Sequence, residues 1–174
     1  MTHEIDAFNT WEDNACNVAL RLVQQHQRFH SHPTDNGVGG KMIGWLRDLT
    51  GKGVSKAAAT HMLKDDLRES MTVLRVRIAS IGHDRLGESR GAVLLFLAQL
   101  PQIGVKRVLG WNDLWNALRD ERWDDAADVL LLTEWPQAMQ DEESKVRAVA
   151  LQRVIRSGKH LHRELAAVSG MHPA

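Results

Sequence analysis

The chain has 174 residues, which is enough to bury a substantial core in one domain without disulfide bonds. Its 22 lysines and arginines balance its 22 aspartates and glutamates, so no net charge favours binding to nucleic acid or to an anionic membrane. Cys16 is the only cysteine, which excludes an internal disulfide and fits a reducing compartment.

The N-terminal residues 1–6 are polar and acidic, with neither the basic nor the apolar region of a signal peptide. The longest apolar run, over 92–98, is far shorter than the roughly 18 residues that a membrane span requires. We therefore expect no membrane span and synthesis in the cytoplasm.

Apolar residues recur at helical spacing in the first part of the chain, and strand signals are weak. A first helix is predicted from residue 6 or 10 to residue 29, with Thr10 as a candidate N-cap. Pro33 and three glycines interrupt the pattern over 30–40. A short helix is expected over 41–49, which places only helices and turns before Gly53.

The rest of the chain also predicts helices. Ser55 is a candidate N-cap for a helix that runs to residue 81, where Gly82 ends it. Residues 88–100 are apolar nearly all round, as expected of a central helix surrounded by others, and Pro101 follows. Further helices are predicted over 105–119, 123–132, 144–157 and 159–167. The predicted fold class is all-α or nearly so.

Four motifs in this helical part occur in a recognisable order. They are Gly53-Val54-Ser55-Lys56, the apolar segment 89–100, the run Arg122-Trp123-Asp124-Asp125-Ala126-Ala127 with Glu134-Trp135 shortly after it, and Arg147 eleven residues before Gly158. This order resembles the C-terminal helical lobe of the phage-type (T-even-like) lysozymes, over residues 53–158.

The resemblance implies a lysozyme-like helical lobe around a buried central helix, with the family's β lobe absent or vestigial. It divides one compact domain into a divergent N-terminal helical segment with a Gly-rich turn (1–52), the lysozyme-like lobe (53–158), and a C-terminal helix and tail (159–174). The lobe contains Trp111, Trp115, Trp123 and Trp135, and most of them are expected to pack in its core or at its edge.

The catalytic segment of such enzymes is not matched. In the family, a glutamate closes the first short helix, and a small sheet then carries an aspartate and a threonine. The candidates here are Glu12 as acid and Asp35 as its partner, but they are 23 positions apart, more than twice the family's spacing. Glu12 would lie near a helix start, which favours the charged carboxylate, and Asp35 also fits a turn residue.

Aromatic and histidine side chains are the other candidates for binding. Trp11 and Trp45 could stack on sugar rings or anchor a partner, although packing in the core is the favoured interpretation, and Asp35 is a further candidate binding residue. His26, His30 and His32 lack the further ligands of a zinc site, so no metal and no cofactor are predicted.

The sequence therefore favours a degenerate phage or prophage lysozyme-like protein that is non-catalytic and binds a protein partner or a peptidoglycan glycan. One alternative is an active peptidoglycan muramidase, a glycoside hydrolase with a displaced catalytic acid. Another is an unrelated all-α interaction protein. A virion-associated location fits the first of these, and the oligomeric state is left open.

Overall fold

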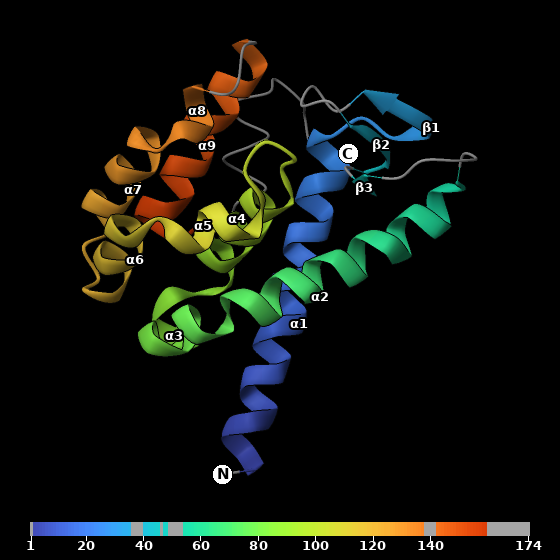
Figure 1. The fold of residues 1–174 in the computed structure, drawn as a ribbon. Coiled ribbons are helices and arrows are strands. Elements are labelled where there is room, and N and C mark those ends of the chain that lie inside the picture. Colours follow the sequence, from blue (N-terminus) through green and yellow to red (C-terminus); the bar gives the residue numbers. More distant parts are fainter. Residues whose placement is uncertain (1, 36–39, 46, 49–53, 138–141, 160–174) are drawn as a thin grey trace.

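The computed structural model describes residues 2–35, 40–45, 47–48, 54–137 and 142–159. These residues are mostly helical, with one small sheet (Figure 1). The helices are α1 (Thr2–His26), α2 (Lys56–Ile81), α3 (His83–Leu86), α4 (Glu88–Gln99), α5 (Gly104–Gly110), α6 (Asn112–Arg119), α7 (Trp123–Leu132), α8 (Glu134–Gln137) and α9 (Glu142–Ser157). Within the described residues, no helix is both long and apolar enough to cross a membrane.

Helix α4 lies at the centre of the helical part, as the sequence predicted. Every residue from Arg90 to Ala98 is buried, and α4 contacts α1, α2, α5 and α9. Helix α1 presents a buried stripe to this core that includes Trp11, Ala15 and Ala19, at a spacing of four residues. The N-terminal segment is therefore part of the main core rather than an appendage to it.

Gly91 allows α1 and α4 to pack closely. A Cβ atom at Gly91 would lie 2.9 Å from Cζ2 of Trp11 and 3.8 Å from Cβ of Ala15. Because only glycine leaves this space open, the Trp11 ring can rest directly on the backbone of the central helix.

Helix α2 begins as predicted, since Ser55 accepts a hydrogen bond from the Ala58 N–H at 3.2 Å. It ends at Gly82, whose φ of 92° is in the range that favours glycine. Helix α1, in contrast, runs straight through Thr10, so the prediction that Thr10 caps this helix is wrong.

The segment between α1 and α2 differs most from expectation. Its strands are β1 (His30–Asp35), β2 (Lys41–Gly44) and β3 (Arg47–Asp48), paired antiparallel in the order β1-β2-β3. The expected helix over 41–49 is therefore wrong. Gly44 has a φ of 65° and lies against Ala59 of α2, which fixes β2 on the long helix.

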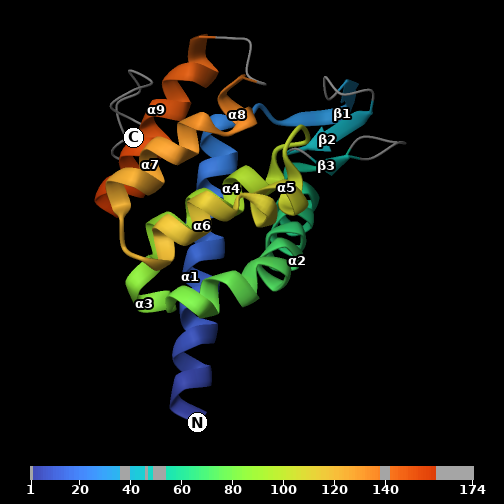
Figure 2. The same cartoon turned by 60° about the vertical axis from the view of Figure 1, so that its left-hand side comes forward.

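The sheet and the later helices lie on opposite sides of the molecule. Figures 1 and 2 both show the sheet near the C-terminal end of α1 and the N-terminal end of α2, with α6, α7 and α9 on the far side. Both views also show the N-terminal turns of α1 extending beyond the other elements. The predicted C-terminal helix over 159–167 lies almost wholly outside the described residues.

Candidate functional site

Glu12 is held in an ion pair between the two long helices. Both of its carboxylate oxygens accept hydrogen bonds from Arg75 of α2, at 2.8 Å from Nε and 2.5 Å from Nη2. The Glu12 side chain is only 14% exposed. A bidentate, charge-assisted pair of this kind fixes α1 to α2 and engages both carboxylate oxygens of Glu12.

Asp35 lies at the end of β1, at the tip of the sheet. Its side chain is 82% exposed and accepts a hydrogen bond from Lys41 Nζ at 2.6 Å, opposite it in the β1–β2 pairing. Fourteen residues of helix separate Glu12 from His26 at the end of α1, a rise of about 21 Å, before the chain even enters the sheet. The carboxyl groups of a glycosidase lie roughly 5–10 Å apart, and the structure does not bring these two together.

The junction between α1 and the sheet carries no acidic side chain, because no aspartate or glutamate occurs between Asp13 and Asp35. Gln24 donates a hydrogen bond to the Thr60 hydroxyl at 3.2 Å, which links the C-terminal end of α1 to α2. The junction therefore offers no carboxyl group, and Gln24 at its edge already has a hydrogen-bond partner on α2.

Trp11 and Trp45, the two candidate binding residues, are both buried, with 6% and 3% of their surfaces exposed. The Trp45 ring lies 5.1 Å from that of Phe29, and Lys56 Nζ lies 5.7 Å from its centroid. Neither indole presents a face to solvent, so packing is the role that the structure supports for both.

The histidines do not form a metal site in the described part of the chain, where no group of three or more potential ligands could hold an ion. The His30 Nδ1 atom lies 3.0 Å from the Thr34 hydroxyl within β1.

Asp66 is a carboxylate that the sequence analysis missed. It lies on α2 where this helix meets the sheet, and it pairs with Arg47 of β3. Burial raises the pKa of Asp66, while the charge of Arg47 opposes the rise. Gln99 of α4 completes the cluster by donating to the Ser70 hydroxyl at 2.8 Å and to the Asp66 carbonyl at 3.4 Å.

The sequence could have indicated a partly buried carboxylate at Asp66 from its position on α2. Asp66 precedes the buried Leu67, and it lies three residues after Leu63 and four before Ser70, both also buried. Its carboxylate therefore faces partly inward. The pair with Arg47 joins the sheet to the helical core and is structural in this arrangement.

A polar pocket of about 330 Å³ opens beside Glu12, between α1 and α2. Cys16 lines it together with Asp13, Arg68 and Thr72. Burial, followed by the charges of Glu12 and Asp13, raises the pKa of the Cys16 thiol to about 11. A thiol with so little thiolate at neutral pH is a poor nucleophile, which argues against cysteine chemistry here.

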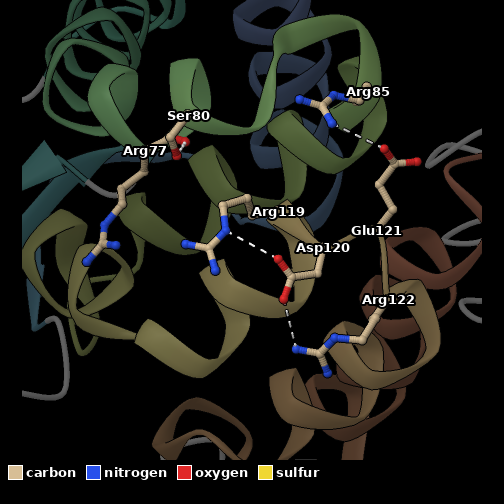
Figure 3. A network of polar contacts seen from close by, with 7 residues as sticks. All are labelled: Arg77, Ser80, Arg85, Arg119, Asp120, Glu121 and Arg122. Atoms are coloured by element: carbon tan, nitrogen blue, oxygen red, sulfur yellow. Dashed lines mark hydrogen bonds and ion pairs between the residues drawn. The ribbon is translucent and has the colours of Figure 1, made fainter.

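A third group of polar side chains gathers around the turn between α6 and α7 (Figure 3). Asp120 accepts from Arg119 at 3.3 Å and from Arg122 at 3.5 Å, and Glu121 pairs with Arg85 at 3.4 Å. Each of the three arginines in these pairs has an acidic partner, so the network fastens the turn between α6 and α7. Arg77 is drawn in the same view but takes no part in these pairs.

No family model and no curated protein matches this chain.

Proposed function

We propose that the protein is a degenerate lysozyme-like protein of phage or prophage type that binds the glycan strands of peptidoglycan without cleaving them. The helical part supports the lysozyme-like assignment, because α4 is buried at the centre and α2 runs from the sheet to the later helices. Arg90 and Trp123, which belong to two of the resembling motifs, stack at 3.8 Å in the same core.

The proposal that activity is lost depends on one observation. The family that the sequence resembles places its acid where the first helix meets the sheet, and here residues 14–34 contain no carboxyl side chain. A general acid cannot be supplied from that segment, and Glu12, the nearest preceding candidate, is bonded to Arg75.

One feature supports the alternative of an active muramidase. A small sheet does lie between α1 and α2, where the family has its β lobe, and Asp35 lies at its tip. The sheet could form one wall of a glycan cleft. Such an enzyme would still need a displaced acid, and Glu12 is the candidate to test.

The experiment incubates purified peptidoglycan with wild-type protein, the Glu12→Gln variant and Asp13→Asn as a matched control. Asp13 is the exposed neighbour of Glu12 on α1 and lines the same pocket. Released muropeptides report cleavage, and sedimentation with the insoluble wall reports binding.

We expect all three proteins to sediment with peptidoglycan and to release no muropeptides. Release by wild type and by Asp13→Asn, but not by Glu12→Gln, would establish a muramidase and refute the proposal. If the wild type neither cleaves nor sediments, the glycan is not the ligand, and a protein partner becomes the hypothesis to test.

A further inference from the structure

A second pocket is lined by residues of α6 and α7, two helices that lie on the opposite side of the molecule from the sheet (Figures 1 and 2). It is formed where the α5–α6 turn meets the C-terminal end of α7, and its volume is about 420 Å³. This lies in the lower part of the range of about 300–1,000 Å³ that is usual for small-molecule sites. Its lining includes Trp111, Asn112, Asp113, Val129, Leu132 and Thr133.

Part of the pocket lining is apolar and open to solvent. Leu132 is 79% exposed, the highest value for a large hydrophobic side chain in the part of the chain that the structure describes. Trp111 and Val129 are partly buried against the core beside it. A partly covered indole and an exposed leucine at the rim of one hollow offer a flat apolar contact to a ligand.

Two further lining residues, Asn112 and Asp113, are polar. The Asn112 Oδ1 atom accepts a hydrogen bond from Arg77 Nη2 at 2.6 Å, which fixes the amide and leaves its N–H donors for another partner. The Asp113 carboxylate, on the exposed first turn of α6, has no hydrogen bond or ion pair with any residue that the structure describes. A donor and an acceptor therefore lie next to the apolar surface.

The charges favour a neutral ligand. Asp113 is the only charged side chain among the described lining residues, and the guanidinium of Arg77 is bonded to the neighbouring Asn112. The positive Arg77 offsets the negative Asp113, so the site favours neither a phosphate nor a free cation.

From this combination we propose that the pocket binds a saccharide unit, with an N-acetylated hexosamine as the preferred class. A pyranose ring has one face of C–H groups, which are attracted to the negative face of an indole. Its hydroxyl and amide groups can donate to the Asp113 carboxylate and accept from the Asn112 amide. Val129 and Leu132 contact the methyl group of an N-acetyl substituent.

The ligand class rests in part on the proposed function, because peptidoglycan is a polymer of N-acetylated hexosamines. The site itself does not rest on it, since the pocket contains none of the candidate catalytic residues and lies away from the sheet. It would hold a glycan on the helical part whether or not the chain is cleaved elsewhere.

The test titrates the full chain with the trimer of N-acetylglucosamine and follows the indole N–H resonances by NMR. Three variants are compared with wild type: Asp113→Asn, Leu132→Ala and Trp111→Phe. Val76→Ala on α2 is the matched control, because Val76 is 78% exposed and lies outside the pocket. The first two variants and the control change surface side chains, so their folding is not at risk.

We expect saturable binding by wild type, with the same affinity in Val76→Ala. Asp113→Asn should bind about tenfold more weakly, since it loses a hydrogen bond to a charged group. Leu132→Ala should also weaken binding, and Trp111→Phe should retain most of it because a ring face remains. Absence of saturable binding, or equal affinity in all variants, would overturn the proposal.

The two proposals can fail separately. If wild type and Asp113→Asn sediment equally with peptidoglycan and the trimer does not bind, the pocket assignment is wrong while the proposed function stands. If the trimer binds in this pocket and peptidoglycan does not sediment the protein, the saccharide site stands and the proposed cell-wall function is wrong.

Discussion

The contact between Arg90 and Trp123 gives a quantitative test of how the helical part is held together. The Arg90 side chain lies 3.8 Å above the Trp123 ring and is only 9% exposed. Its guanidinium donates to three carbonyls, at 2.7 Å to Ile155, 3.3 Å to Leu86 and 3.3 Å to Arg156. One side chain therefore joins α4 to α3, α7 and the last turn of α9.

Removing either partner should cost several kcal/mol. Arg90→Met loses hydrogen bonds from a charged donor, each worth at most about 1.5–3 kcal/mol, and leaves buried carbonyls unpaired. We expect this variant to lower the free energy of unfolding by about 3 kcal/mol in total. A fully buried tryptophan costs about 3–5 kcal/mol when it is cut to alanine, and Trp123 is only partly buried, so we expect about 3 kcal/mol.

The double variant reports the contact itself. A cation–π pair removed from water is worth about 1–2 kcal/mol, so the double variant should be less destabilised than the sum of the single variants by about that amount. The free energies of unfolding are measured by urea denaturation. Arg85→Met is the control, because Arg85 is 58% exposed in its pair with Glu121 and should change stability by less than about 1 kcal/mol.

Two results would refute this reasoning. Arg90→Met within about 1 kcal/mol of wild type would show that the guanidinium is not needed to satisfy the end of α9. Strict additivity in the cycle would show that Arg90 and Trp123 are neighbours without a stabilising interaction.

Three further predictions concern other parts of the core. Gly91→Ala should destabilise the protein by about 1–3 kcal/mol in thermal unfolding, because the new methyl group meets the Trp11 ring. Unchanged stability would contradict the close packing of α1 on α4. The pKa of Asp66 is raised in the folded state, so its contribution to stability is present at acid pH and falls as pH rises through the folded pKa. Arg47→Met removes the opposing positive charge and should raise the pKa of Asp66 further in a carboxyl NMR titration. A lower pKa of Asp66 in this variant would refute the assignment. With a pKa of about 11, only about one Cys16 thiol in a thousand is ionised at pH 8. Alkylation of Cys16 should therefore be far slower in the native protein than in urea. Equal alkylation rates would show that the thiol is exposed.

Much of the fold could be predicted from local patterns. Ser55 and Gly82 bound α2 as expected, since a cap and a stop act on the nearest turn of backbone. The all-round apolar segment became the buried α4, because a helix with no polar face has to be surrounded. Both results depend only on residues within a few positions of one another.

The candidate site could be predicted only in part. Glu12 and Asp35 were identified as carboxylates of interest, but the sequence does not show that Arg75, 63 positions from Glu12, takes both of its oxygens. Asp66 was missed because its partner, Arg47, comes from another element. The pocket at Leu132 likewise joins α6 to α7 in a way that spacing along the chain does not reveal.

By itself, the sequence determined the helical class, the central helix and the shortage of acidic residues before Asp35, because periodicity and composition are local properties. Only the tertiary structure decided that residues 41–44 and 47–48 form strands rather than a helix. Met42 and Ile43 suit a short helix or a strand equally well. The pairing of β2 with β1 and β3, and the packing of Gly44 against Ala59, select the strand. Those stabilising contacts come from elements distant in the sequence, so they arise only once the chain has folded.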